Sequence, residues 1–266
     1  MQAMLSVHSL PILGDNYVWI LVQDQQAVIV DPGDADPVLG FVARQGLSVA
    51  AVLITHHHAD HTGGLAKTAA AFEGAPVYGP AAERISGVTH PVEAEDTLRI
   101  ARFPGSFRVI PVPGHTSGHI AYLWTPPEEG EPPVLLAGDS LFAGGCGRVF
   151  EGTPEQMHAS LQRLAQLPGE TRVCCGHEYT VANLEFAVRV EPRNDTLRER
   201  LEWARRERRE GRPTVPSTME QEWATNPFLR TGNPDVRAQA EARAGGPLES
   251  EAAVFAVIRA WKDRGD

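Results

Sequence analysis

The residues best suited to chemistry lie in one short segment, THHHADH at positions 55–61. This segment overlaps the end of AAVLIT at positions 50–55, a short apolar run of the kind that forms a strand buried on both faces. Because alternate residues of an extended segment project to the same side, His56 and His58 can converge on one metal ion. The pattern H-x-H-x-D-H therefore predicts a metal site at the end of a buried strand.

Further candidate ligands follow this first pair. A turn permitted by Gly63–Gly64 lets Asp60 and His61 reach a second metal ion. A solvated surface cluster of histidines is the competing interpretation. The presence of Asp60 among the histidines and the position of the segment at the end of a strand argue against it. Three more candidates stand at the ends of later strand-like runs, where α/β folds gather their sites: His115, Asp139 and His177.

These candidates amount to seven ligands, which suffice for two metal ions with one aspartate bridging them. Imidazole and carboxylate donors suit zinc, and iron and manganese are alternatives that would accept the same donors. Two other histidines, His57 and His119, lie beside the ligands in the sequence. We expect them to support the ligands from behind rather than to bind metal.

Strand-like and helical patterns alternate over the first two thirds of the chain and would position these ligands. Two stretches, 16–33 and 118–140, share a layout of strand, turn, strand and then an aspartate. This faint internal repeat predicts two similar β-rich halves covered by helices, which is a four-layer αββα sandwich of the α/β class. The strand-like runs cover 17–22, 27–33, 50–55, 107–113, 119–124, 133–139 and 171–177, and the helical patterns cover 37–45, 64–72 and 154–167.

The character of the sequence changes after about Val181, where alternating β-branched residues disappear. We expect a catalytic domain over residues 1–180 and a C-terminal helical domain over 181–266, packed against the sandwich. The second part contains a charged helical run at 196–212, a proline-rich break at 213–216, and helical patterns at 217–223, 235–244 and 249–262.

Composition disfavours several classes of function. The 266-residue chain has a formal net charge of −10, whereas a nucleic-acid surface needs a basic field. No apolar run reaches the length of a membrane span, and the N-terminus lacks the features of a signal peptide. The three cysteines are an odd number and indicate no disulfide framework. These features predict a cytoplasmic protein without nucleic-acid or membrane partners.

Several segments carry a resemblance to known families. The segments THHHADH, PGHTSGH, LLAGDSLF and CCGHEYT together resemble the metallo-β-lactamase superfamily, which implies its αββα sandwich. The segments GCGRVFEGT, GHEYT, PSTMEQEWATNPFLR and RAWKD resemble the glyoxalase II, or hydroxyacylglutathione hydrolase, family across essentially the whole chain. That resemblance implies hydrolysis of S-(2-hydroxyacyl)glutathione thioesters by a hydroxide that bridges two divalent metal ions. The reaction converts S-lactoylglutathione to glutathione and lactate, the second step of methylglyoxal detoxification.

Carried over position by position, the resemblance assigns roles to individual residues. The catalytic carboxylates Asp60 and Asp139 would act chiefly as ligands. No general acid is needed, because the leaving thiolate comes from a thiol with a pKa of about 8.5 and requires little protonation. The first metal ion would be held by His56, His58 and His115, the second by Asp60, His61 and His177, with Asp139 bridging them. Contacts to a glutathione thioester, the small-molecule partner, would come from Arg148, Tyr179, Arg259 and Lys262 in a monomeric enzyme.

The substrate-binding positions contain one departure from the family. Phe150 stands where many members have a tyrosine, so one hydroxyl contact to glutathione would be missing. Arg259 and Lys262 lie three residues apart on an expected helix and therefore share a face. A solvated charge cluster at the end of that helix is the other interpretation of this pair.

Other functions remain as alternatives at this stage. A lactonase, a β-lactamase or a persulfide dioxygenase could share the same superfamily fold. A β-lactamase would usually carry a signal peptide, and a persulfide dioxygenase would leave several of the seven ligand positions unused. RNA processing by the same metal core is disfavoured by the net charge of −10. A non-catalytic metal-binding protein would leave a complete ligand set unexplained.

Overall fold

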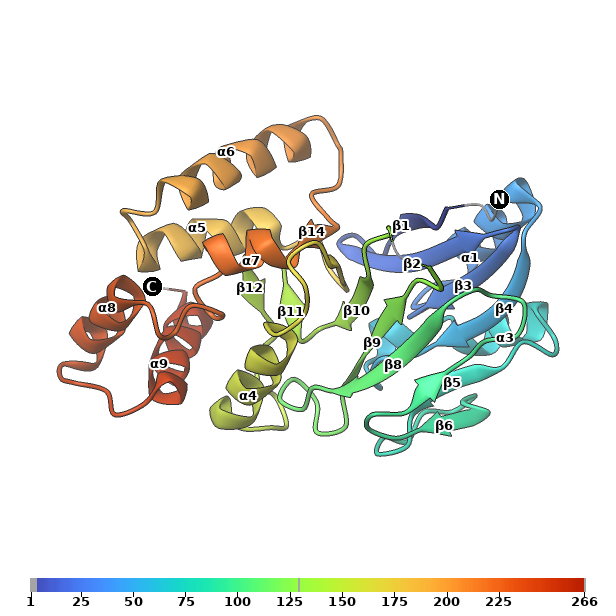
Figure 1. Ribbon diagram of the computed structural model, residues 1–266, viewed down its shortest axis with the longest axis horizontal. Coiled ribbons are helices and arrows are strands. Elements are labelled where there is room, and N and C mark those ends of the chain that lie inside the picture. The colour runs from blue at the N-terminus through green and yellow to red at the C-terminus, as the bar shows by residue number, and fades with distance from the viewer. Residues whose placement is uncertain (1–3, 129, 266) are drawn as a thin grey trace.

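The computed structural model describes residues 4–128 and 130–265 and consists of two β-sheets with helices on their outer faces (Figure 1). The first sheet has the order β1-β2-β3-β4-β5-β6, with bounds Ser6–Ile12, Asn16–Gln23, Gln26–Val30, Ser48–Leu53, Val77–Pro80 and His90–Val92. The second has the order β14-β13-β10-β9-β8-β7, with bounds Ser217–Thr218, Arg172–Cys175, Val134–Gly138, Ile120–Thr125, Ser106–Pro111 and Thr97–Leu98. A short hairpin pairs β11 (Leu141–Phe142) with β12 (Gly145–Cys146).

The helices divide into two groups along the chain. The helices of the first group are α1 (Ala35–Gln45), α2 (Ala59–Thr62), α3 (Leu65–Ala71) and α4 (Pro154–Leu164). Those of the second group are α5 (Thr180–Val190), α6 (Asp195–Arg209), α7 (Met219–Thr225), α8 (Pro234–Ala244) and α9 (Glu251–Arg264), which gather at one end of the molecule (Figure 1). Within the described residues, no helix is both long and apolar enough to span a membrane.

The layering follows from the alternation of side chains along each strand. In β3, Val28 and Val30 belong to the apolar core between the two sheets, whereas Ile29 belongs to the core beneath α1. The outer face of the second sheet shares a third core with α4, α8 and α9, where Leu135 and Phe255 are buried together. The predicted four-layer αββα sandwich of the α/β class, with a C-terminal helical region, is therefore confirmed.

The structure also contains elements that the sequence patterns did not predict. Helix α5 begins at Thr180, at the expected start of the helical domain, but its residues carried no helical prediction. The strands β1, β5, β6, β7, β11, β12 and β14 were likewise not predicted. Strand β14 lies in the helical region and pairs with β13 of the second sheet. The division at residues 1–180 and 181–266 stays a prediction.

Candidate metal centre

The predicted metal ligands lie where strands of the two sheets end. His56 and His58 are in the loop that follows β4, while Asp60 and His61 lie in the short helix α2 directly after it. Asp139 is the first residue after β10, and the other two candidates come from loops at the same edge of the second sheet: His115, between β8 and β9, and His177, after β13. The structure thus brings all seven residues together from four segments of the chain.

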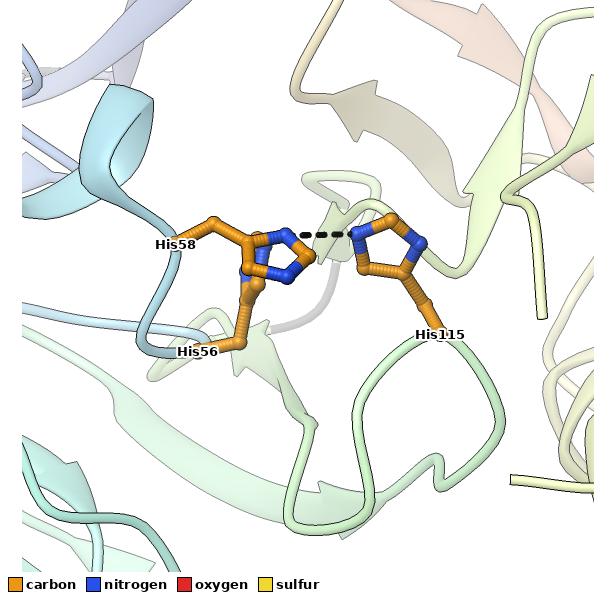
Figure 2. Close-up of side chains that lie close together, drawn as sticks. All are labelled: His56, His58 and His115. Carbon is orange, nitrogen blue, oxygen red and sulfur yellow. Dashed lines mark hydrogen bonds between the residues drawn. The ribbon is translucent and has the colours of Figure 1, made fainter. Parts of the chain in front are cut away.

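The side chains form two groups of three. In the first group, one nitrogen each of His56, His58 and His115 lies within 4.8 Å of the others, and Figure 2 shows the three rings turned toward one another. In the second group, one atom each of Asp60, His61 and His177 meets the same limit. Each group therefore offers three donor atoms to one ion.

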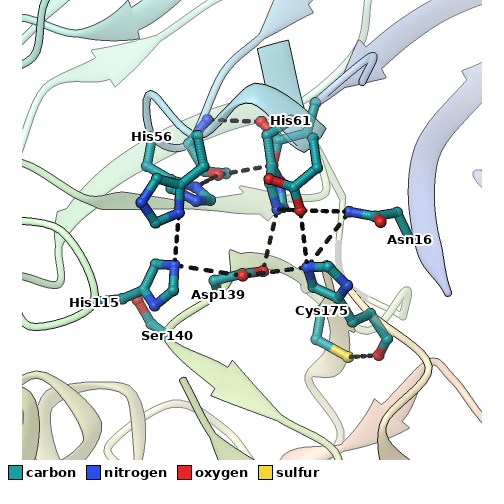
Figure 3. Close-up of polar contacts among 12 residues, drawn as sticks. Asn16, His56, His61, His115, Asp139, Ser140 and Cys175 are labelled. Atoms are coloured by element: carbon teal, nitrogen blue, oxygen red, sulfur yellow. Dashed lines mark hydrogen bonds and ion pairs between the residues drawn. The ribbon is translucent and has the colours of Figure 1, made fainter. Parts of the chain in front are cut away.

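Asp139 lies between the two groups (Figure 3). Its Oδ2 is 3.5 Å from Nε2 of His115 and 3.2 Å from Nε2 of His177, and its Oδ1 is 3.3 Å from Nε2 of His61. One carboxylate thus contacts rings of both groups. This is the position that a bridging ligand needs.

The donor atoms fit a cation because several of them are buried without a hydrogen bond. Nε2 of His56, Nε2 of His61 and Oδ1 of Asp139 have no hydrogen bond within the described part of the chain. A buried polar atom left in this way costs about 1–3 kcal/mol. Three such atoms gathered in one place are what a site built for positive charge would show.

Other side chains fix the orientation of the ligand rings. Asp31 Oδ2 lies 3.0 Å from Nδ1 of His61, and Asp15 Oδ1 lies 2.9 Å from Nδ1 of His177. Asn16 donates from Nδ2 to Oδ2 of Asp60 over 2.8 Å. Because a proton on Nδ1 leaves the lone pair of Nε2 free to bind metal, the contacts of Asp31 and Asp15 favour the tautomers that ligation requires.

The sequence patterns missed these three supporting residues. Asp31 follows strand β3, and its backbone φ is +52°, in the left-handed region that the turn of AVIVDPG requires. A polar residue at the end of a buried strand was the available signal for Asp31. Asp15 and Asn16 offered no such pattern, because their partner His177 lies more than 160 residues away along the chain.

The two extra histidines, His57 and His119, lie beside the candidate ligands, and their supporting role stays a prediction. His119 is buried, stacks on the ring of His56 with the centroids 4.5 Å apart, and accepts a hydrogen bond from the backbone nitrogen of Asp139. His57 lies between two carboxylates, Glu83 and Glu151, at 3.0 and 3.3 Å. Neither ring belongs to the two groups of three.

The absence of a side chain at Gly176 allows the second group to close. A Cβ atom there would lie 2.7 Å from Cε1 of His61 and would overlap Oδ1 of Asp139. The backbone of the loop after β13 therefore approaches the two ligands more closely than any other residue type would permit.

The charges of the site are strongly coupled. Burial lowers the pKa of His177, but its hydrogen bonds to Asp139 and Asp60 outweigh that effect and raise it to about 10. The bond with His177 is the main cause that lowers the pKa of Asp60. Burial raises the pKa of Asp139, but the charge of His61 and the contacts of His177 outweigh burial and hold this pKa well below its ordinary value. The two aspartates therefore remain carboxylates, which is the form that binds cations.

A cavity of about 470 Å³ opens from the metal ligands toward the helical region. All four predicted substrate residues line it: Arg148, Tyr179, Arg259 and Lys262. Phe150 also lines it, and this side chain is 61% exposed with its ring 5.2 Å from that of His115. The cavity therefore joins the two groups of ligands to a wall that carries positive charge.

The four substrate residues differ in how they are held. Arg259 is buried and donates to the backbone oxygen of Cys146 over 3.0 Å and to Asp263 over 2.9 Å. Lys262 donates to Oδ1 of Asn183. Arg148 is exposed and 3.6 Å from Asp263, while Tyr179 stacks on the ring of His177 with the centroids 4.6 Å apart.

The fold and this site define a member of the metallo-β-lactamase superfamily, whose family model matches residues 12–177. A second model, described as the hydroxyacylglutathione hydrolase C-terminus, matches residues 178–265. The chain belongs to the hydroxyacylglutathione hydrolase family, and it is accordingly a metal-dependent hydrolase.

Curated relatives support this placement, and solved structures share the fold. The chain is 53% identical over 262 residues to a hydroxyacylglutathione hydrolase of Halorhodospira halophila, covering 98% of this chain and 99% of that protein. It is 51% identical over 263 residues to one of Alkalilimnicola ehrlichii, covering 98% and 100%. The crystal structure of ETHE1 from Myxococcus xanthus has the same fold, with a TM-score of 0.63, 24% identity and coverage of 99% and 100%. A structure in a di-iron-bound form has a TM-score of 0.55 and 26% identity, covering 84% of this chain and 100% of that one.

Proposed function

We propose that this protein hydrolyses S-(2-hydroxyacyl)glutathione thioesters, with S-lactoylglutathione as the expected substrate. The observation that carries the proposal is one cavity lined both by five of the seven metal-ligand candidates and by Arg259 and Lys262. The family relationship supports the same reaction, since relatives about 50% identical over nearly the whole chain are named hydroxyacylglutathione hydrolases. The reaction would be the second step of methylglyoxal detoxification.

The metal ions would be held by the two groups of three ligands. His56, His58 and His115 would hold the first ion; Asp60, His61 and His177 would hold the second, and Asp139 would contact both. When bound, two divalent ions supply hydroxide at neutral pH and polarise the thioester carbonyl. We propose zinc, and iron or manganese would accept the same donor set.

The chain's own residues prepare the site in three ways. Asp60 and Asp139 keep their negative charge, because nearby histidines lower the pKa of both. Phe150 lies edge-on to His58 and His115 and gives that side of the cavity an apolar surface. A general acid is not needed, because the leaving thiolate belongs to a thiol whose pKa is about 8.5.

Substrate recognition is assigned to the wall of the cavity that carries the positively charged side chains. Arg148 and Arg259 bring two positive charges to it and Lys262 a third when it is protonated, while Asp263 supplies one negative charge that pairs with both arginines. The excess positive charge complements the two carboxylates of glutathione, on a protein whose overall charge is −10. Tyr179 would contact the substrate from its position on the His177 ring.

The division of labour between the two parts of the chain belongs to the same proposal. Residues 1–180 would supply the metal ligands, and residues 181–266 would supply the substrate-binding helix α9 that carries Arg259 and Lys262. A monomer would suffice, because the ligands and the cationic wall come from one chain. A cytoplasmic location suits a substrate made from glutathione and a chain whose three cysteines are free thiols.

The test compares substrates on the metal-loaded protein. Hydrolysis of S-lactoylglutathione would be measured beside a lactoyl thioester of N-acetylcysteamine, a lactone and a β-lactam. We expect the highest kcat/KM for S-lactoylglutathione, and two metal ions per chain by elemental analysis. Faster turnover of the lactone or the β-lactam would refute the proposed substrate, and full activity with one ion per chain would refute the two-ion assignment.

A further inference from the structure

Asn183 lies in the wall of the cavity and has no part in the metal chemistry. It belongs to helix α5, is 2% exposed and lines the same cavity as Lys262. Its Nδ2 donates to the backbone oxygen of Ala143 over 3.1 Å, and its Oδ1 accepts the hydrogen bond from Nζ of Lys262. One side chain therefore links the β11–β12 hairpin to helix α9.

The orientation of this amide is fixed by its two partners. A backbone carbonyl can only accept and an ammonium can only donate, so the NH₂ group must face Ala143 and the oxygen must face Lys262. The amide also has little room to move, because a Cβ atom on Gly145 would lie 2.6 Å from Cγ of Asn183. The ammonium of Lys262 is consequently held at one place relative to the hairpin.

The charged groups around Lys262 explain why a neutral acceptor matters there. Burial is the main cause that lowers the pKa of Lys262 to about 7, and the charge of Arg259 is the next; Cys146 and Asp263 oppose them, and Arg189 lowers the pKa least. Asp263 is already hydrogen-bonded to Arg259. Since Asn183 contributes no charge, the positive charge of Lys262 stays available to an anion in the cavity.

We propose that Asn183 is a positioning residue for substrate affinity, which ties the Lys262 ammonium to the β11–β12 hairpin so that it meets a carboxylate of the glutathione moiety. The hairpin also carries Phe142, which lines the cavity and packs edge-on against the ring of His177. This amide thereby ties the Lys262 ammonium itself to the hairpin, while Arg259 of the same helix bonds to the hairpin at Cys146. This inference rests on the proposed glutathione thioester substrate.

The experiment measures affinity separately from turnover. S-methylglutathione, which has no thioester to hydrolyse, would be titrated calorimetrically into metal-loaded wild type, Asn183→Ala and Asn194→Ala. Asn194 is a matched control, because its side chain also donates to one backbone oxygen and accepts from one backbone nitrogen, at the start of α6 and outside the cavity lining. Metal content, thermal midpoint and the kcat on the N-acetylcysteamine thioester would be recorded for each protein.

We expect Asn183→Ala to weaken the binding of S-methylglutathione about tenfold at pH 6.5, roughly the loss of one charge-assisted hydrogen bond. Metal content and the kcat on the small thioester should stay at the wild-type values, and Asn194→Ala should leave the affinity unchanged. If Asn183→Ala binds S-methylglutathione as tightly as Asn194→Ala does, the proposal is wrong. Parallel losses of metal and of small-thioester turnover would assign Asn183 a general structural role and would also overturn it.

A second variant, Asn183→Asp, tests the link to Lys262 through pH. In the wild type, the affinity should fall as pH rises through about 7, because Lys262 then loses its charge. A carboxylate at position 183 stabilises the ammonium, so the fall should move to higher pH. The pKa of the Cys146 thiol is raised by burial, so this thiol stays neutral over the same range. An unchanged pH profile would contradict the proposal, whereas a wild type that binds S-methylglutathione but does not hydrolyse S-lactoylglutathione would contradict only the proposed function.

Discussion

The contact between Asp31 and His61 offers the sharpest test of how the metal site is supported. Asp31 is buried, and its Oδ1 accepts from the backbone nitrogen of Thr55 over 2.8 Å. Its Oδ2 lies 2.7 Å from the hydroxyl of Thr55 and 3.0 Å from Nδ1 of His61. The substitution Asp31→Asn keeps the shape of the side chain and the first of these bonds, but it places an NH₂ group where Oδ2 was.

The expected cost follows from the tautomer of His61. With an NH₂ group opposite, a proton on Nδ1 has no acceptor, so the ring must either lose that hydrogen bond or move the proton to Nε2. A proton on Nε2 removes the lone pair that would bind the metal ion. Loss of such a supporting contact typically costs 10- to 100-fold in metal affinity, or about 1.4–2.7 kcal/mol.

The assay is equilibrium dialysis of metal-free protein against graded free zinc, followed by elemental analysis. We expect one of the two ions to be lost from Asp31→Asn at a free zinc concentration that still saturates the wild type. Asp34→Asn is a matched control, because Asp34 is a nearby aspartate that caps α1 by accepting from the backbone nitrogen of Asp36. Superimposable binding curves for Asp31→Asn and the wild type would refute the argument from the tautomer.

Three further predictions address the cavity and the helical region. Lys262→Met should raise KM for S-lactoylglutathione about 10- to 150-fold while kcat on a small thioester changes little, because the contact persists from ground state to transition state. Phe150→Tyr should strengthen glutathione-thioester binding by up to about 1.5 kcal/mol, measured as a lower KM, and no change would mean that the added hydroxyl finds no partner. Glu222→Gln should destabilise the protein by about 3 kcal/mol in urea unfolding, because it leaves Arg200, which is 2.6 Å away and also buried, without its counter-charge.

The candidate metal ligands could be picked out from the sequence because each stands at the end of a strand-like run that the local pattern alone reveals. The residues that orient them could not, because their contacts join distant parts of the chain: Asp15 and His177 are 162 positions apart, and Asn183 and Lys262 are 79 apart. Nothing in the local periodicity near Asp15 or Asn183 encodes a partner so far away. Such contacts follow only from the way in which the two sheets and the helices pack.

Helix α5 was missed for a different physical reason. Its sequence, TVANLEFAVRV, contains three valines, whose β-branched side chains are more typical of strands, and no capping side chain marks its start at Tyr179. The helix nevertheless buries Leu184 and Phe186, each in a separate apolar core of the protein. Tertiary packing therefore decided its conformation against a weak local preference.

The β11–β12 hairpin shows why the two parts of this chain must be understood together. It lies just after Asp139, yet its backbone is satisfied largely by side chains of the helical region. Five consecutive residues take part: Phe142 and Gly145 accept from Asn226, Ala143 accepts from Asn183, Gly144 donates to Glu222, and Cys146 accepts from Arg259. Unpaired backbone groups at these buried positions would be costly, so the sandwich alone would not favour this conformation of the hairpin. The helices that carry the proposed substrate-binding cations thus also shape the segment that follows Asp139.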